Sequence, residues 1–371
     1  VSAASPLALA PAPAPAGAAD ADRTRAPVRG AAGCGLGLDL DDERTLTPRR
    51  FGNVAEAAMP WDKTTASHGF ATQGPAPAGV PWGLGRAPGR TAAFVSLASD
   101  PNVCFRPYME DGQHVADPLL LRGAPGSEDA WGFFAVYDGH GGRHEVDYCE
   151  SKLHELVMDE LRREASEHLD VGRVLVESFR KVDAQLAMLG AWKSGCCATV
   201  ALLHRRGAAA TLHVANVGDS RAVLVGPGLA KRVSRDHRAS DPEEAKRIAA
   251  DGGFVRHGRV AGSLSVSRSL GDHHLKECGV SCVPDVCSCT LEAGEASGGL
   301  ALVIASDGLW DALEDDDARQ VVRDCVAAAE TRGCGPEGTA AELRGSAARS
   351  LVEVAKERGS RDNILALVVF F

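Results

Sequence analysis

The chain has 371 residues, with 40 lysines and arginines against 50 aspartates and glutamates, which gives a formal net charge of −10 at pH 7. Such an acidic chain is poorly suited to non-specific nucleic-acid binding, and none of its apolar runs approaches the roughly 18 residues of a membrane span. The 11 cysteines are an odd number spread unevenly along the chain, which predicts mostly reduced thiols rather than the disulfide framework of a small secreted domain.

The first 90 residues have the composition of a linker. Residues 1–22 are dominated by alanine and proline, and residues 69–89 are rich in glycine and proline. Such segments bury too little apolar surface to offset chain entropy, so we expect 1–90 to be disordered or linker-like and 91–371 to form the folded domain. The glycines between 33 and 37 do not make a dinucleotide-binding loop, because no strand pattern precedes them and no amphipathic helix follows. We therefore expect no nucleotide cofactor.

Short apolar runs predict the strands of the folded domain. Each run has the length of a strand, and residues 205–207, between two of them, have the composition of a hairpin turn. The predicted strands cover residues 91–97, 131–137, 197–204, 211–217, 221–225, 300–305 and 364–371.

Amphipathic segments predict helices that come in pairs. One further helix begins after Ser240, with Pro242 near its start and acids in its first turn, and ends before Gly252. Strands joined by hairpins, together with paired helices, favour an α+β fold over repeated βαβ units. The paired helices have apolar residues at spacings of three and four and are predicted at 144–164, 171–189, 315–330 and 337–357.

Three aspartates stand where apolar strands end or begin. Asp138 follows the run 131–137, Asp307 follows the run 300–305, and Asp362 stands just before the last strand. Carboxylates at the ends of buried strands are partly desolvated and repel one another unless a cation lies between them. Oxygen ligands without histidine or cysteine clusters favour Mg²⁺ or Mn²⁺ over Zn²⁺. Aspartate before glycine is also a common turn pair, so a structural role stays open for Asp138 or Asp307 taken alone.

Two segments add groups suited to phosphate chemistry. In 106–111 (RPYMED), the adjacent acids Glu110 and Asp111 could supply a metal ligand and an acceptor, and Arg106 an anion-binding fork. A solvated loop with a surface ion pair is the alternative. After Asp138, the Gly139 carbonyl can turn toward a metal, and the neighbouring His140 is a candidate proton donor near neutral pH.

These segments belong to an ordered series that resembles the metal-dependent type 2C serine/threonine protein phosphatases, the PPM family. The series extends over residues 91–371, about three-quarters of the chain. Single pieces of it are weak signals, but the full order and spacing are specific. It includes RPYMED at 106–111, VYDGHGG at 136–142, SGCCATV at 194–200, VANVGDSRAV at 214–223, RVAGSLSVSRSLGD at 259–272, IASDGLWD at 304–311 and SRDN at 360–363.

The resemblance implies a β-sandwich of two mainly antiparallel sheets flanked by helix pairs (α-β-β-α), with two Mg²⁺ or Mn²⁺ ions at one end. It implies that Asp138 bridges the two metals and that Asp307 and Asp362 complete the first metal site. Glu110 and the Gly139 carbonyl would complete the second. A third, weaker metal position would fall at Asp236, shared with Asp307 and with Asp311 as a further candidate ligand.

The resemblance also implies the catalytic groups. Arg106 would grip the substrate phosphate, Asp111 would hold waters around the metals, and His140 would protonate the leaving serine or threonine oxygen. A water between the two metals would attack phosphorus, so no covalent phosphoenzyme is required. The sequence does not favour a cysteine phosphatase, because no cysteine is followed by an arginine six residues later.

Some residues depart from the family's pattern. Cys196 and Cys197 stand where serine and threonine are usual, and Ala261 stands where asparagine is common. We expect small effects on folding or loop packing. Asp219 is interpreted as a turn residue that bonds the backbone. For four closely spaced thiols we expect no shared role, with a redox- or metal-sensitive switch as the alternative: Cys278, Cys282, Cys287 and Cys289.

The sequence therefore predicts a protein serine/threonine phosphatase that hydrolyses phosphoserine and phosphothreonine at a binuclear Mg²⁺ or Mn²⁺ site. The alternative is a catalytically inactive protein that keeps the fold for binding or as a scaffold. Inactive members lose metal-binding acids, whereas this chain retains Glu110, Asp138, Asp307 and Asp362. We expect phosphorylated proteins as partners, no nucleic acid and no membrane span, and a monomer in the cytoplasm or nucleus.

Overall fold

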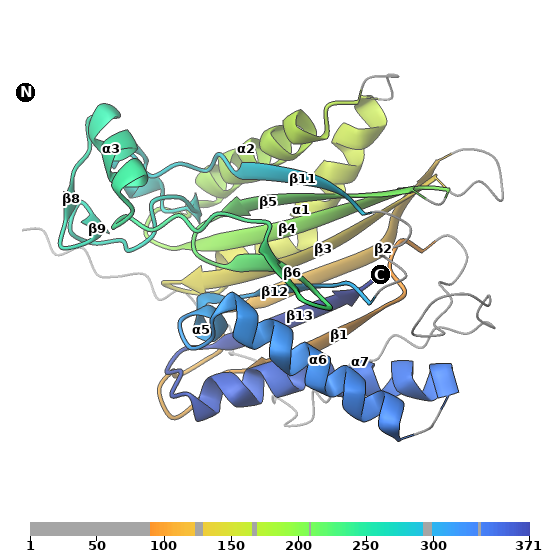
Figure 1. Cartoon of the computed structure of the whole chain (residues 1–371). Coiled ribbons are helices and arrows are strands. Elements are labelled where there is room, and N and C mark those ends of the chain that lie inside the picture. The colour runs from red at the N-terminus through yellow and green to blue at the C-terminus, as the bar shows by residue number, and fades with distance from the viewer. Residues whose placement is uncertain (1–89, 123–128, 165–168, 208, 292–298, 333–334) are drawn as a thin grey trace, which may run out of the picture. The chain divides into compact units, whose positions relative to one another are not determined.

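The computed structural model describes residues 90–122, 129–164, 169–207, 209–291, 299–332 and 335–371 (Figure 1). All of them belong to one compact unit of the chain, Asp62–Phe371. The predicted linker-like segment 1–90 lies outside the described residues apart from Arg90, so its character stays a prediction.

Two antiparallel sheets form the centre of this unit. Sheet A has the strand order β1-β13-β12-β6-β7, and its strands are β1 (Phe94–Asp100), β6 (Arg221–Gly226), β7 (Leu229–Arg232), β12 (Ala301–Ala305) and β13 (Ile364–Phe370). Sheet B has the order β11-β5-β4-β3-β2, and its strands are β2 (Gly112–Arg122), β3 (Asp129–His140), β4 (Gly195–Arg206), β5 (Ala209–Val217) and β11 (Asp285–Leu291). Three short strands lie outside this order: β10 (Leu270–Gly271), which pairs with β4, and the pair β8 (Val255–Arg256) and β9 (Arg259–Val260).

Long helices cover the outer faces of the sheets (Figure 1). Helices α1 (His144–Arg163) and α2 (Val171–Leu189) share a buried apolar cluster with sheet B. Helices α6 (Asp315–Thr331) and α7 (Gly335–Glu357) share one with sheet A. The shorter helices are α3 (Pro242–Ala250), α5 (Asp307–Trp310) and the 3₁₀ helix η1 (His273–Cys278).

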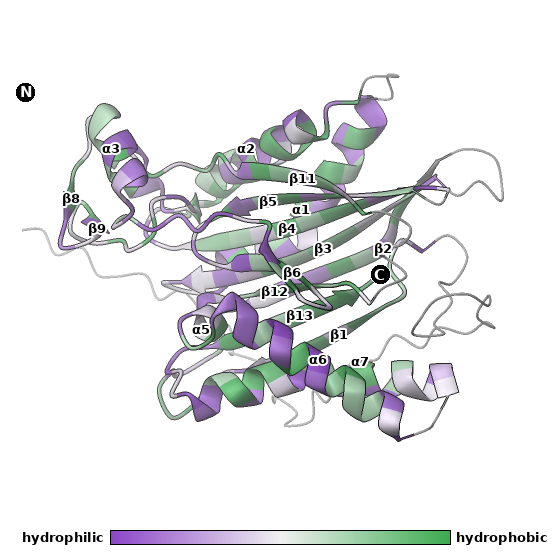
Figure 2. Cartoon of the chain, in the orientation of Figure 1, coloured by the Kyte–Doolittle hydropathy of each residue, from purple (hydrophilic) through white to green (hydrophobic). Residues whose placement is uncertain are grey.

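Alternation along the strands divides the apolar side chains among three layers. In β3, Phe133 belongs to the cluster that contains Phe179 of α2, whereas the next residue, Phe134, belongs to the cluster between the sheets with Leu367 of β13. Figure 2 shows the resulting hydrophobic strands and the mixed faces of the outer helices. The layers run helices, sheet B, sheet A, helices, which confirms the predicted α-β-β-α fold.

Two strands of sheet B were not predicted from periodicity. They are β2 and β11, which form the two edges of that sheet. Strand β2 contains Pro118, and β11 has a polar sequence with mostly half-buried or exposed side chains. An edge strand is shielded less than a central one, so its apolar pattern is weaker. By contrast, α2 has the predicted bounds, because it combines strong apolar spacing with the N-cap Asp170 and Gly190 in a left-handed conformation after its end.

Strand ends from both sheets meet at one end of the sandwich. In sheet B, Gly112 at the start of β2 pairs with Tyr137, one residue before Asp138. In sheet A, Ala305 at the end of β12 pairs with Ala366, near the start of β13. The acids that flank these strands are therefore brought to a common place.

Candidate active site

Five of the predicted carboxylates surround this junction of the sheets. The backbone N–H of Asp307 donates to Oδ2 of Asp138, at 3.4 Å. The backbone N–H of Glu110 donates to Oδ1 of Asn363, at 2.8 Å, which places the segment that bears Glu110 and Asp111 beside Asp362. The structure thus brings together Glu110, Asp111, Asp138, Asp307 and Asp362, which come from four different strand ends.

The carboxylates at the junction repel one another in a desolvated setting. Burial, followed by the charges of Asp307 and Asp111, raises the pKa of Asp138 well above its ordinary value. Burial, followed by the charges of Asp219 and Asp362, does the same to the pKa of Asp307. Burial raises the pKa of Asp111 to about 7, although the hydrogen bond from Ser306 opposes the shift. The positive charge that the protein places near Asp111, Asp138 and Asp307 is too small to offset burial and mutual repulsion, so their ionised forms are disfavoured.

Two glycines allow the close approach of the site's segments. A Cβ on Gly139 would lie 2.7 Å from the carbonyl oxygen of Glu110, and one on Gly308 would lie 1.9 Å from that of Asn363. Both distances are too short for real carbon–oxygen contacts. Gly139 is thus required where β3 passes the segment before β2, and Gly308 where α5 passes the start of β13.

Arg106, the predicted phosphate-binding group, lies at the border of the carboxylates. Its guanidinium is ion-paired with Asp362, and its side chain is 42% exposed. A partly exposed guanidinium beside an acid predicted to bind metal can reach an incoming anion, which suits the predicted role.

His140, the predicted proton donor, ends β3 and is held by a buried acid. Its Nε2 lies 2.7 Å from Oδ2 of Asp272, which stands directly after β10. Burial alone lowers the pKa of His140, but the hydrogen bond and charge of Asp272 outweigh it, so the pKa is raised from 6.5. Asp272 was not assigned a role from the sequence, although it ends the quoted series at 259–272.

The structure does not bring Asp236 into the carboxylate group as the resemblance suggested. Arg221 donates to both carboxylate oxygens of Asp236. Its Nε lies 3.2 Å from Oδ1 and from Oδ2, and its Nη2 lies 2.6 Å from Oδ2. Asp219 lies nearer: it offers a carboxylate oxygen within 4.8 Å of ligand atoms of Asp138 and Cys197. The sequence contained a signal for placing Asp219 in the site, because Asp219 comes shortly after the apolar strand 211–217, much as Asp138 comes after 131–137.

Asp219 is also part of a charged pair with Arg238. Nε of Arg238 lies 3.2 Å from Oδ2 of Asp219, and its Nη2 lies 2.5 Å from Oδ1 of Asp311. Arg238 therefore joins Asp219 to the last acid of the segment 304–311. Burial raises the pKa of Asp219, and Arg238 opposes that rise.

The cysteines that depart from the family's pattern are buried. Cys196 faces Cys149 of α1 with its sulfur 3.8 Å away, which is not a disulfide, and Cys197 lies 3.5 Å from Oδ1 of Asp219. Among the described residues, the four closely spaced thiols do not form a group of three or more ligand atoms. Cys282 is half-buried, with its pKa raised by burial to about 11, whereas Cys287 is exposed.

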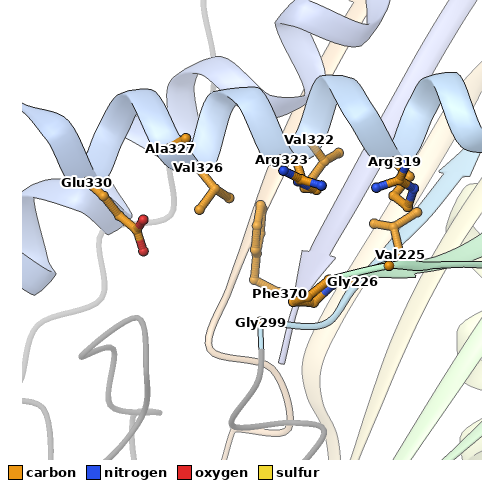
Figure 3. Close-up of a pocket in the computed structure, with 12 residues that line it drawn as sticks. Val225, Gly226, Gly299, Arg319, Val322, Arg323, Val326, Ala327, Glu330 and Phe370 are labelled. Carbon is orange, nitrogen blue, oxygen red and sulfur yellow. The ribbon is translucent and has the colours of Figure 1, made fainter.

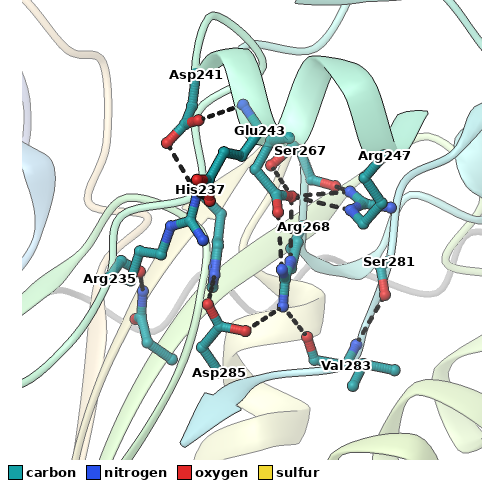
Figure 4. A network of polar contacts seen from close by, with 12 residues as sticks. Arg235, His237, Asp241, Glu243, Arg247, Ser267, Arg268, Ser281, Val283 and Asp285 are labelled. Atoms are coloured by element: carbon teal, nitrogen blue, oxygen red, sulfur yellow. Dashed lines mark hydrogen bonds and ion pairs between the residues drawn. The ribbon is translucent and has the colours of Figure 1, made fainter. Parts of the chain in front are cut away.

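A network of charged groups ties the segment after β7 to sheet B (Figure 4). Arg268 donates to Oε1 of Glu244, at 2.7 Å, and to Oδ1 of Asp285, at 2.8 Å. The other oxygen of Asp285 lies 3.1 Å from Nε2 of the fully buried His237. The hydrogen bond with His237 is the main reason why the pKa of Asp285 falls to about 2. This network fixes α3 and the segment before β10 against β11 of sheet B.

The donor set fits hard divalent cations. The described site offers carboxylate oxygens from Glu110, Asp138 and Asp307, and like-charge repulsion leaves Asp138 and Asp307 in need of a positive partner. All-oxygen sites with carboxylates favour Mg²⁺ or Mn²⁺. The sulfur of Cys197 lies close to Asp138 and Asp219. Burial and the charge of Asp219 raise the pKa of Cys197 well above 9.0, so it is a neutral thiol rather than a thiolate ligand.

A cavity of about 470 Å³ lies elsewhere, between α6 and the far end of sheet A (Figure 3). Arg319, Val322 and Val326 of α6 point into it from one side, and Phe370 of β13 closes it from the other. None of the predicted site residues lines this cavity. The chemistry of the molecule is therefore assigned to the carboxylate end of the sandwich rather than to its cavity.

A four-layered α-β-β-α sandwich that gathers carboxylates from both sheets at one end is the architecture expected of a metal-dependent protein phosphatase. A model of the family described as protein phosphatase 2C matches residues 99–364. The chain belongs to this family of protein serine/threonine phosphatases. In the described part of the chain, no helix is both long and apolar enough to cross a membrane.

Several known proteins resemble the chain. Protein phosphatase 2C homolog 1 of Saccharomyces cerevisiae is 33% identical over 293 residues, covering 74% of this chain and 92% of the yeast protein. Protein phosphatase 2C homolog 1 of Schizosaccharomyces pombe is 35% identical over 293 residues, covering 78% of this chain and 76% of that protein. A solved structure of a C. elegans sex-determining protein has a TM-score of 0.61 at 26% identity and covers 74% of this chain and 64% of that one. Serine-threonine phosphatase 2C from Toxoplasma gondii, at 22% identity and a TM-score of 0.56, shares the fold and covers 75% and 94%.

Proposed function

We propose that the carboxylate end of the sandwich is a binuclear Mg²⁺ or Mn²⁺ site that hydrolyses phosphoserine and phosphothreonine in proteins, in a domain covering residues 91–371. The observation that carries the proposal is the pair Asp138 and Asp307, whose pKa values are raised by burial and by neighbouring carboxylates. Such an arrangement is costly for a protein unless cations share the site.

The carboxylates would divide between two metals. Asp138 would contact both, Asp307 and Asp362 would bind the first, and Glu110 with the Gly139 carbonyl would bind the second. When bound, the metals would activate the attacking water and stabilise charge on the phosphoryl oxygens. Asp219 is better placed than Asp236 for a weaker third metal, because it offers an oxygen within 4.8 Å of a carboxylate oxygen of Asp138. Asp311, which shares Arg238 with Asp219, is the further candidate ligand.

The chain's own residues would handle the phosphate and the leaving group. Arg106 would exchange part of its contact with Asp362 for the phosphoryl oxygens. Since Nε2 of His140 is held by Asp272, Nδ1 is the nitrogen that would give its proton to the leaving serine or threonine oxygen as the P–O bond breaks. The attacking water forms the new P–O bond and loses its proton to solvent. With the metals bound, the buried carboxylate of Asp111 would accept hydrogen bonds from the surrounding waters.

The test is phosphate release from a phosphothreonine peptide. We expect turnover with Mn²⁺ or Mg²⁺, loss of turnover in EDTA, and a loss of roughly a hundredfold or more in Asp138→Asn. Asp129→Asn is the matched control, since Asp129 begins the same strand at its opposite end and should leave turnover unchanged. If Mn²⁺ gives no turnover above that of Asp138→Asn, the inactive binding or scaffold protein becomes the better proposal.

Substrate, compartment and oligomeric state are proposed on narrower grounds. Phosphorylated proteins are the substrates that family membership implies. The sulfurs of the buried Cys149 and Cys196 lie 3.8 Å apart without a disulfide, which supports a reducing compartment such as the cytoplasm or nucleus. We propose a monomer, because one chain supplies every metal-binding acid, and sedimentation of the purified protein would test it.

A further inference from the structure

Asp272 is a buried acid in an unusual backbone conformation. Asp272 is only 1% exposed. Its backbone has φ 49° and ψ 40°, a left-handed conformation that L-residues rarely adopt. Its backbone N–H donates to the carbonyl of Ser194, at 2.9 Å. The preceding residue, Gly271, donates to Oδ1 of Asp183, at 2.9 Å. The turn is thus held from both sides in a conformation that would otherwise be disfavoured.

The carboxylate of Asp272 is aimed at His140. Its Oδ2 lies 2.7 Å from Nε2 of His140 and accepts a hydrogen bond from Oγ of Ser269, also at 2.7 Å. A Cβ on Gly195 would lie 2.3 Å from the same oxygen, so the glycine leaves space for the carboxylate. Three neighbours from separate segments therefore define where this one oxygen lies.

The burial of the two partners is unequal. The Asp272 side chain is 2% exposed, whereas the His140 side chain is 30% exposed. The acid is therefore enclosed by protein, while the ring that it holds remains partly accessible from outside. A second pair, His204 with Asp129, lacks this inequality: the separation is 3.0 Å, and the side chains are 24% and 26% exposed.

We propose that Asp272 is a positioning residue that holds the His140 ring with Nε2 inward and Nδ1 toward the leaving oxygen of the substrate. The inference rests on the proposed role of His140 as proton donor and deepens it. A carboxylate behind an imidazole sets the ring's orientation and decides which nitrogen faces the reaction, as in other acid–histidine pairs. Ser269 supports Asp272 in turn.

The experiment compares two substrates that differ in their need for a proton. A phosphothreonine peptide has an alkoxide leaving group, whereas p-nitrophenyl phosphate has a leaving group that departs without protonation. In Asp272→Asn we expect kcat for the peptide to fall by about 10- to 100-fold, with KM little changed and kcat for the aryl ester falling by less than about threefold. Ser269→Ala should show the same selectivity with a smaller loss. Asp129→Asn, which alters the pair of Asp129 with His204, should show none.

A double-mutant cycle separates positioning from structural damage. In a His140→Ala background, Asp272→Asn should cause no further loss on the peptide. Equal losses on both substrates, or losses that add to those of His140→Ala, would overturn the inference. If His140→Ala itself loses both activities equally, the proposed proton donor is wrong, which is a distinct result. If Asp272→Asn does not fold, as judged by its melting temperature, the same comparison with Ser269→Ala decides: selectivity supports the inference and its absence refutes it.

Discussion

Oγ of Ser306 donates a hydrogen bond to Oδ2 of Asp111 over 2.7 Å. Ser306 follows β12 of sheet A, and Asp111 precedes β2 of sheet B, so this bond joins the two sheets at the centre of the site. The same hydroxyl accepts a hydrogen bond from the backbone N–H of Leu365, at 3.1 Å. A carboxyl that is 3% exposed is thereby held between the layers, where its protonation affects the whole fold.

The first prediction concerns the pH dependence of stability without metal. The pKa of Asp111 is about 7 in the folded chain against an ordinary value of 3.8. Between these values the folded state holds a proton that the unfolded state has released, so stability falls as pH rises. In EDTA we expect the free energy of unfolding to be lower at pH 8 than at pH 5, by on the order of 2–4 kcal/mol. Melting temperatures at the two pH values measure this.

Two controls accompany that measurement. Asp111→Asn should reduce the difference between pH 5 and pH 8, because it removes the titrating group. Addition of Mg²⁺ should raise the melting temperature more at pH 8 than at pH 5, since the metal binds ionised carboxylates. A metal-free protein that becomes more stable between pH 5 and pH 8 would contradict the raised pKa of Asp111.

The second prediction separates Asp219 from Asp236. Asp236→Asn removes one of the two acid partners of the buried Arg221, so it should lower the free energy of unfolding by about 1–3 kcal/mol without changing the Mn²⁺ requirement. Asp219→Asn relieves repulsion near Asp138 and should instead raise the Mn²⁺ concentration needed for half-maximal activity. Chemical denaturation and metal titration of both variants give the two readouts. The reverse pattern would restore the metal role predicted for Asp236 from the resemblance.

The third prediction concerns Gly308. An added methyl group would lie 1.9 Å from the carbonyl oxygen of Asn363, so the start of β13 must shift, and Asp362 with it. We expect Gly308→Ala to lower stability by about 1–3 kcal/mol and to weaken metal binding, measured by calorimetric titration with Mn²⁺. Gly345→Ala in α7 is the matched control, since no atom lies within 4 Å of its added Cβ. That variant should be neutral or slightly more stable, and equal damage from both would contradict the packing argument.

The fourth prediction has the opposite pH sign. The pKa of Asp285 falls to about 2 in the folded chain. Its stabilisation is present above the ordinary value of 3.8 and is lost as pH falls toward 2. Asp285→Asn should therefore be less stable than the parent at pH 6 and should lose less stability between pH 4 and pH 2. Acid unfolding followed by circular dichroism tests this, and parallel curves for the two proteins would show that Asp285 does not titrate in that range.

Local patterns in the sequence were sufficient for much of the fold. Helix α2 has its predicted bounds, and Asp138 and Asp307 were singled out because each follows an apolar strand. These features depend on residues a few positions apart, where periodicity and capping act directly. The edge strands β2 and β11 were missed because an edge buries too little to impose a clear alternation.

The chain has ten more acidic than basic residues, and the roles of these acids were determined partly by the sequence and partly by the tertiary structure. The sequence by itself determined that the chain carries acids at strand ends and a histidine next to one of them. Only the tertiary structure decided that Asp236 is taken by Arg221, that Asp219 lies beside Asp138, and that Asp272 holds His140 across 132 residues of chain. Such pairings depend on which strands become neighbours. That is set by the packing of distant segments in the sandwich, and no local spacing encodes it.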